Sequence, residues 1–145
     1  MSESRITVAE FETLVEEAAP FAADYDFRVE SIERGRAAVR LPASDRHLRP
    51  GGTVSGPAMM ALADFTMYAV TLSEVGRVPL AVTTSLNINF LRRPRPGDVV
   101  ARGRSLKAGR RLVVIEVDVF SEGMDEPVAH VTGTYSVPPG DSETE

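Results

Sequence analysis

The sequence predicts an α+β fold in which one long buried helix is wrapped by a curved antiparallel sheet. Its 145 residues are 43% hydrophobic and 26% charged, an ordinary composition for one globular domain. Residues 57–73 are apolar on nearly every side, so a helix formed by them must be covered by other elements. The segments around it read as strands without long crossovers between them, which favours antiparallel pairing.

The N-terminal part of the chain supplies one helix and two strands. Thr7 and Glu10 stand at capping-box spacing, and apolar residues then recur at helical intervals until Pro20 closes the helix. Strands are expected at residues 27–32 and 36–41, joined by a tight turn.

A loop at residues 42–56 leads into the long helix. It is rich in proline and glycine, and loops of this length inside a compact domain are often functional. The helix is expected at residues 57–73, with Ser55 or Gly56 as its cap and Gly76 at its end.

Four strands are expected in the C-terminal half of the chain. In the first, residues 80–90, apolar and polar residues alternate. The even-numbered side chains from Leu80 to Phe90 are therefore expected to share one apolar face. The other three strands are expected at residues 99–107, 112–120 and 127–137.

A turn at residues 109–111 would fix the register of the two strands beside it. If those residues form the loop, Arg104 faces Glu116 on the neighbouring strand. Arg102 then faces Asp118 in the same way, and both pairs join opposite charges.

We divide the chain into an N-terminal helix (residues 1–24), a main domain (residues 25–137) and a polar, acidic tail (residues 138–145). The tail is expected to be disordered, because it has too few apolar side chains to bury.

Composition argues against several classes of function. A net charge of −5 disfavours a nucleic-acid binder, which usually carries a basic stripe. The absence of cysteine excludes disulfides and thiolate chemistry, and no motif for a metal or a cofactor is present. The longest apolar stretch holds about 16 residues, fewer than the roughly 20 of a membrane span. With no secretory signal pattern either, a cytoplasmic protein without a membrane partner is expected.

Asp64 is the only charged residue in the predicted long helix. A buried, isolated carboxylate costs several kcal/mol unless it is hydrogen-bonded, paired or neutral. One interpretation is a nucleophile or general base in a partly desolvated site. The other is a structural aspartate that caps a loop or pairs with an arginine across an interface.

The start of that helix is the second candidate feature. Free N–H groups at a helix N-terminus stabilise an anion or a developing oxyanion, and Gly56 has no side chain to block its N–H. Alternatively, the glycine serves only the geometry of the loop. Eight residues separate Gly56 from Asp64, a rise of about 12 Å along one helix. If both act on one substrate, they should come from two protomers that share a site.

Four segments in order carry a resemblance to a known family. They are GGTVSGPAMMALADFTMY, VTTSLNINFLRRPRPGD, GRRLVVIEVDVF and AHVTGTYSV. Together they resemble the hotdog-fold thioesterase superfamily, and more narrowly its phenylacetic-acid-degradation type of acyl-CoA thioesterase, over about residues 25–137. The resemblance implies hydrolysis of an acyl- or aryl-CoA thioester by a homo-oligomer, either a dimer or a dimer of dimers (a homotetramer).

The resemblance also implies roles for individual residues. Asp64 falls on the family's nucleophile or general base, and Gly56 on the glycine whose amide polarises the thioester carbonyl. Thr83 falls on a Ser or Thr that helps to place water. Arginines near the strand-connecting turns of the family often meet the phosphates of coenzyme A. The matching candidates are Arg92, Arg93, Arg95, Arg110 and Arg111.

The sequence departs from the family's pattern in the loop. The family usually carries Asn early in the loop and His directly before the glycine, where this chain has Arg49 and Ser55. Pro57 replaces a second glycine. Ser55 can still donate or accept a hydrogen bond, or cap the helix. Arg49 is either a ligand for a substrate carboxylate or phosphate, or an exposed loop residue.

Candidates for an acyl pocket lie on the long helix, with plain core packing as the alternative. They are Met60, Met67 and Tyr68, followed by Met59 and Phe65. A non-catalytic binder of acyl-CoA or another acyl ligand is the second functional hypothesis. A dehydratase-like enzyme is the third, but such enzymes usually employ a histidine, and neither His47 nor His130 stands at the helix start.

Overall fold

The computed structural model describes residues 3–139 and confirms the predicted α+β fold. Its helices are α1 (Val8–Ala18) and α2 (Gly56–Val75), with short 3-10 helices η1 (Pro20–Asp24) and η2 (Asp45–His47). Its strands are β1 (Arg28–Glu33), β2 (Arg36–Leu41), β3 (Val82–Phe90), β4 (Val99–Ala108), β5 (Leu112–Ser121) and β6 (Ala129–Ser136). The tail was predicted to be disordered, and its residues from 140 on lie outside the described part of the chain.

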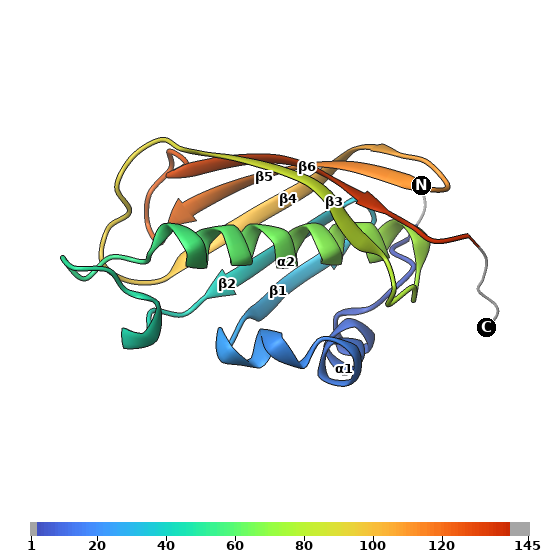
Figure 1. Ribbon diagram of the computed structural model, residues 1–145, viewed down its shortest axis with the longest axis horizontal. Coiled ribbons are helices and arrows are strands. Elements are labelled where there is room, and N and C mark those ends of the chain that lie inside the picture. The colour runs from blue at the N-terminus through green and yellow to red at the C-terminus, as the bar shows by residue number, and fades with distance from the viewer. Residues whose placement is uncertain (1–2, 140–145) are drawn as a thin grey trace.

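One antiparallel sheet, in the order β1-β2-β4-β5-β6-β3, wraps around α2 (Figure 1). Small residues let the central strands approach the helix closely. A Cβ on Gly103 of β4 would lie 3.0 Å from Thr66 Cγ2 and 3.1 Å from Val70 Cγ2. The sheet therefore covers the apolar surface of α2 along most of its length, as the sequence predicted.

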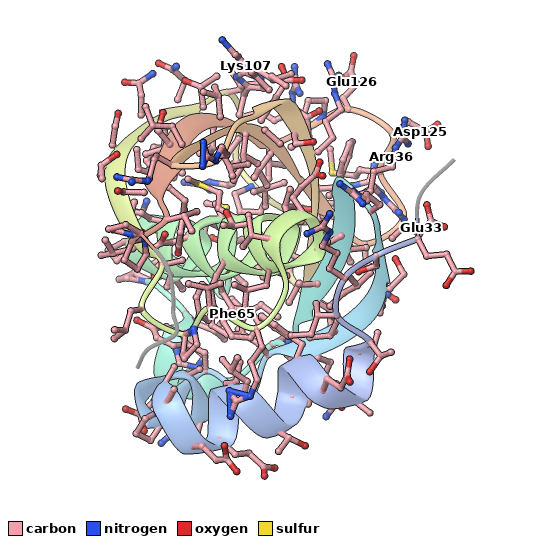
Figure 2. All side chains as sticks on the ribbon, turned by 90° about the vertical axis from the view of Figure 1, so that its right-hand side faces the viewer. Glu33, Arg36, Phe65, Lys107, Asp125 and Glu126 are labelled. Atoms are coloured by element: carbon pink, nitrogen blue, oxygen red, sulfur yellow. The ribbon has the colours of Figure 1, made fainter. Side chains whose placement is uncertain are left out.

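Helix α1 packs against α2 around Phe65 and Tyr68. The predicted capping box is present, because Thr7 Oγ1 accepts from the Glu10 N–H and Glu10 Oε1 from the Thr7 N–H. Phe11 of α1 is fully buried, and its ring lies 5.4 Å from that of Phe65 and 5.7 Å from that of Tyr68. Figure 2 shows Phe65 between α2 and α1.

A β-bulge in β3 makes one sequence prediction wrong. Thr83 pairs with Tyr135 on β6, and the next paired residue is Ser85 rather than Thr84. Thr84 is thus an extra residue, which reverses the alternation of faces. Val82 does not share a buried face with the apolar residues later in the strand and is 56% exposed. The bulge turns the Thr83 hydroxyl toward α2 instead.

The turn between β4 and β5 follows the prediction. Arg104 pairs with Glu116 in the register, and their side chains form an ion pair of 2.6 Å. Arg102 and Asp118 are also register partners. Glu116 Oε2 lies 2.8 Å from His130 Nε2 on β6, so these side chains link three strands on the outer face of the sheet.

Stability at acid pH is expected to depend on Glu116. The hydrogen bond with His130, helped by the charge of Arg104, lowers the pKa of the Glu116 carboxyl below its usual value. A group whose pKa is lower in the folded state stabilises the fold above its unfolded pKa of about 4.3 and loses this effect as the pH falls further. Glu116→Gln should therefore flatten the loss of stability between about pH 5 and 3, measured by urea unfolding. Glu12→Gln on α1 is the matched control, and equal slopes for wild type and Glu116→Gln would contradict the assignment.

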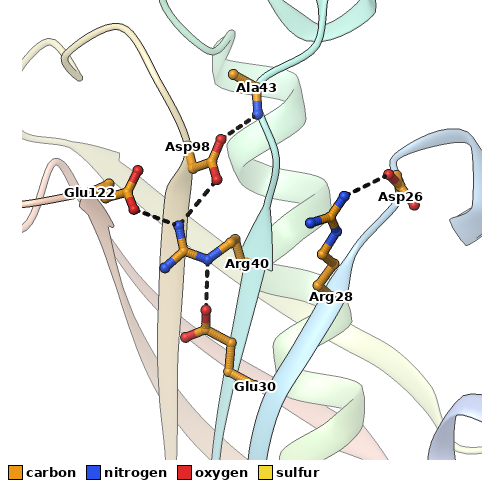
Figure 3. Close-up of polar contacts among 7 residues, drawn as sticks. All are labelled: Asp26, Arg28, Glu30, Arg40, Ala43, Asp98 and Glu122. Carbon is orange, nitrogen blue, oxygen red and sulfur yellow. Dashed lines mark hydrogen bonds and ion pairs between the residues drawn. The ribbon is translucent and has the colours of Figure 1, made fainter.

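A cluster around Arg40 holds the end of β2, from which the long loop departs (Figure 3). Its guanidinium pairs with Glu30 at 2.6 Å, and with Asp98 and Glu122 at 3.1 Å each. Asp98 also accepts a hydrogen bond from the Ala43 N–H at 2.8 Å. The cluster thereby joins β1 and β2 to the residues directly before β4 and directly after β5, at the base of this loop.

The loop at residues 42–55 contains regular structure of its own. It contains η2, and Leu48 and Val54 form an isolated antiparallel bridge around a tight turn. The Arg46 guanidinium and the His47 ring both lie within hydrogen-bond distance of the Asp24 carbonyl oxygen. The loop is thus attached to η1 and delivers Ser55 to the start of α2.

Candidate active site

The N-terminus of α2 carries a single open N–H group. Ser55 is the cap, as predicted, and its hydroxyl accepts from the Ala58 N–H at 3.3 Å. The Met59 N–H donates to the Ser55 carbonyl oxygen at 3.0 Å, and Pro57 has no N–H. Within residues 3–139, the Gly56 N–H has no acceptor, and the helix dipole places partial positive charge there.

Phe90 lies directly over this helix start. A Cβ built on Gly56 would lie 3.2 Å from Phe90 Cζ, so glycine is what permits the ring to approach. The ring is nevertheless 51% exposed, and Met60, one turn along α2, is 42% exposed. These two side chains form an apolar surface beside the open N–H.

Asp64 lies one turn beyond Met60 and is partly buried. Its Oδ1 accepts hydrogen bonds from the Thr83 hydroxyl at 2.6 Å and the Tyr135 hydroxyl at 3.0 Å. Across the described part of the chain no Lys or Arg forms an ion pair with it. The partly buried carboxylate is therefore held by neutral donors alone, an arrangement that suits a nucleophile or a general base.

Tyr135 is the site residue that sequence reasoning missed. It is 5% exposed, and its hydroxyl lies 3.2 Å from the Asp64 carbonyl oxygen as well as 3.0 Å from the carboxylate. Burial, reinforced by the charge of Asp64, raises the pKa of the Tyr135 hydroxyl far above its usual value. The phenol thus stays protonated and acts as a donor. Its signal in the sequence is weak, because it depends on the β3–β6 register.

Inward-facing residues of β3 connect the two ends of this site. Leu86 and Ile88 are half-buried and lie in the strand between Thr83 and Phe90. One strip on the molecular surface, which we call the α2–β3 strip, therefore runs from Gly56 and Phe90 to Asp64 and Thr83. It comprises Gly56, Met60, Asp64, Thr83, Leu86, Ile88 and Phe90.

Four of the five predicted pocket residues lie in the core rather than in the α2–β3 strip, and these are Met59, Phe65, Met67 and Tyr68. Met67 is fully buried and packs against Gly133 of β6. Tyr68 is 8% exposed, its ring lies between those of Phe11 and Tyr135, and its hydroxyl donates to the Pro79 carbonyl oxygen. Packing in the core of one protomer accounts for the burial of Met67 and Tyr68.

The predicted arginine ligands lie at different ends of the molecule. Arg92 and Arg93 follow Phe90 and are exposed near the start of α2, where Arg92 contacts Glu126 and the Pro127 carbonyl oxygen. Arg110 is exposed in the β4–β5 turn, about 30 Å away along a ten-residue strand. Arg49 is exposed in the tight turn of the loop.

The described residues offer neither a membrane span nor a metal site. Neither helix of residues 3–139 is long and apolar enough to cross a membrane. The same residues contain no cluster of three or more His, Asp or Glu side chains suited to a metal ion.

An antiparallel sheet wrapped around one long helix defines the hotdog fold, and comparisons with known proteins agree. The family model described as "Thioesterase superfamily" matches residues 51–128. The chain belongs to this superfamily, which places it among hydrolases of thioester or ester bonds.

Individual relatives extend the match over most of the chain. A "putative thioesterase" from Silicibacter sp. TM1040 is 44% identical, with a TM-score of 0.83 over 94% of this chain and 96% of that one. A variant of the phenylacetic acid degradation protein PaaI from Thermus thermophilus is 30% identical, with a TM-score of 0.71 over 82% and 99%. A "putative esterase" from Saccharolobus solfataricus is 29% identical over 114 residues, 77% of this chain and 79% of its own length.

Proposed function

We propose that this chain is an acyl-CoA thioesterase in which Asp64 carries the reaction. The observation that supports this most is a partly buried carboxylate that is held by two hydroxyls and has no cationic partner among the described residues. The PaaI relative, a protein of phenylacetic acid degradation, makes aryl-CoA esters natural first substrates.

In the proposed reaction, the Gly56 N–H donates to the carbonyl oxygen of the thioester and stabilises the oxyanion that forms. The Asp64 carboxylate then either attacks the carbonyl carbon or removes a proton from an attacking water. In the first case coenzyme A leaves as the thiolate, takes a proton from water, and a second water hydrolyses the mixed anhydride. In the second case the protonated Asp64 returns the proton of the attacking water to the departing sulfur, and coenzyme A leaves as the thiol. Ser55 serves this step indirectly, because its cap leaves the neighbouring N–H of Gly56 as the open donor.

The site is proposed to form between two protomers. Both groups lie on α2, and eight residues of helix separate Gly56 from Asp64 by about 12 Å. That distance is too long for one thioester carbonyl to reach both groups in the same protomer. A second protomer that presents its own α2–β3 strip would bring Gly56 of one chain to Asp64 of the other.

A difference in charge between the two edges of the sheet supports one position for the second protomer. The β1 edge is guarded by charge, with exposed Arg28, Glu30 and Glu33. The outward side chains of the β3 edge are neutral, as at Asn87, and Val82 and Leu80 nearby are 56% and 76% exposed. An unguarded edge with apolar neighbours suits pairing with a second copy, so we propose a dimer through β3. A dimer of dimers is compatible with this edge contact.

Exposed arginines are proposed to bind the phosphates of coenzyme A. Arg92 and Arg93 stand at the end of the α2–β3 strip where the thioester carbonyl would meet Gly56. Arg110 lies in the β4–β5 turn, at the end of the protomer opposite to Gly56, and would contribute only to a site on another protomer. Met60 and Phe90 offer an apolar wall for the acyl group.

Thiol release from a panel of acyl- and aryl-CoA esters tests the proposal. The protein contains no cysteine, so a thiol-reactive dye reports only the coenzyme A product. We expect saturable turnover with at least one class of ester. Saturable binding of the esters without thiol release would instead identify a non-catalytic acyl-CoA binder.

A further inference from the structure

We propose that Tyr135 is a positioning residue that fixes Asp64 and makes Oδ2 the reacting oxygen of its carboxylate. This inference rests on the proposed function of Asp64. It adds a residue on the last strand, and it selects one of the two carboxylate oxygens.

The two hydroxyls that contact Asp64 reach the same oxygen atom. Thr83 Oγ1 and the Tyr135 hydroxyl lie 2.6 Å and 3.0 Å from Oδ1. Among the described residues no donor contacts Oδ2. A carboxylate oxygen that already accepts two hydrogen bonds is a poorer nucleophile and base than its unbound partner, because its lone pairs are engaged. Oδ2 is therefore the oxygen left for the thioester or for water.

Tyr135 also fixes the backbone of the residue that it positions. Its hydroxyl lies 3.2 Å from the Asp64 carbonyl oxygen and 3.0 Å from Oδ1, so its one proton is shared between the backbone and the carboxylate of the same residue. The ring is 5% exposed and lies 5.9 Å from the ring of Tyr68, one turn of α2 beyond Asp64. A packed ring has little freedom, so the direction of its hydroxyl is set by the core.

The bulge in β3 is what brings the two donors together. Thr83 and Tyr135 are register partners on β3 and β6, so their side chains leave the sheet on the same side. If β3 paired regularly from Ser85 backwards, Thr84 would stand opposite Tyr135 and the Thr83 side chain would leave the sheet on the other side, so the bulge decides that Thr83 meets Asp64. The irregular strand thus has a specific purpose at the site.

Tyr135→Phe removes the hydroxyl and retains the ring. With an aryl-CoA ester that the wild type hydrolyses, we expect kcat to fall about 10- to 100-fold while KM stays within about twofold, because only the orientation of a charged acceptor is lost. Tyr25→Phe is the matched control, since the Tyr25 ring stacks on Phe27 and His47 and lies outside the α2–β3 strip.

Thr83 provides a second pair of variants, so the test does not depend on one protein that folds. Thr83→Val should lower kcat in the same way, and Thr83→Ser, which restores a hydroxyl, should recover most of it. The double variant Tyr135→Phe with Thr83→Val loses both donors to Oδ1. Its kcat should therefore be well below the value obtained by multiplying the two single-variant reductions.

The outcomes separate this inference from the proposed function. If the wild type hydrolyses an ester and Asp64→Asn does not, unchanged kcat in Tyr135→Phe overturns the role of Tyr135 alone. If the double variant shows only the product of the single effects, the two hydroxyls do not hold one oxygen together. If the wild type hydrolyses no ester, the proposed function itself fails.

Discussion

Asp64→Asn is expected to lower thioester turnover by about 10³-fold or more, because the amide can neither attack the carbonyl nor accept a proton from water. The fold should survive, since the amide oxygen of asparagine can still accept from Thr83 and Tyr135. Initial rates of thiol release, at saturating and at low ester concentrations, measure the loss in kcat and in kcat/KM.

Asp118→Asn is the matched control for this change. Asp118 lies on β5 and faces the outer surface of the sheet, so the same chemical substitution there should leave the rate within about twofold of the wild type. Retained turnover in Asp64→Asn, with the ester still bound, would make Asp64 a structural aspartate.

Gly133→Ala is expected to destabilise the fold by about 3 kcal/mol, an overpacking effect at the upper end of the usual range. A Cβ at Gly133 would lie 2.3 Å from Met67 Cε and 2.8 Å from the Ser85 carbonyl oxygen. The methionine can move, but the carbonyl belongs to β3, so the two strands must separate. Thermal unfolding followed by circular dichroism should show a Tm lower by about 10 °C.

Two further variants show which contact is responsible. Gly109→Ala is the control, because its Cβ would meet only the Leu112 carbonyl oxygen at 3.5 Å, an ordinary contact. Gly133→Ala with Met67→Leu should recover only part of the loss, since the strand backbone remains in the way. Full recovery would mean that the methionine alone is the obstacle, and the predicted strain on β3 would then be wrong.

Most of the fold follows from local patterns in the sequence. The apolar composition around Asp64 predicts a helix that other elements must cover, and Ser55 and Gly76 are found at its two ends. The capping box at Thr7 and the turn after β4 are also where the sequence predicts them. Each of these features depends on residues within a few positions of one another, which is why a single sequence suffices to predict them.

The candidate site depends on contacts that a sequence pattern does not contain. Asp64 and Gly56 stand out because a lone charge and a glycine at a helix start are local signals. Tyr135 does not, because its contact with Asp64 requires the β3–β6 register and the bulge at Thr84. Strict alternation along β3 predicted the opposite orientation for the residues before the bulge, and one extra residue suffices to reverse it.

Subunit complementation tests most directly the claim that Asp64 and Gly56 act in one site shared by two protomers. Gly56→Pro removes the open N–H at the first position of the helix, where the backbone suits proline. Its ring displaces the exposed Phe90 side chain, which a Gly56→Ala variant with its N–H intact controls for. Asp64→Asn removes the carboxylate. Gly56→Pro and Asp64→Asn should each be inactive alone. When the two variants are co-expressed and their protomers exchange freely, half of the dimers contain one copy of each variant. Each mixed dimer holds one intact site out of two, so about a quarter of the wild-type activity should return. Activity that stays at the level of the two parents, in mixed dimers shown to form, would contradict a shared site.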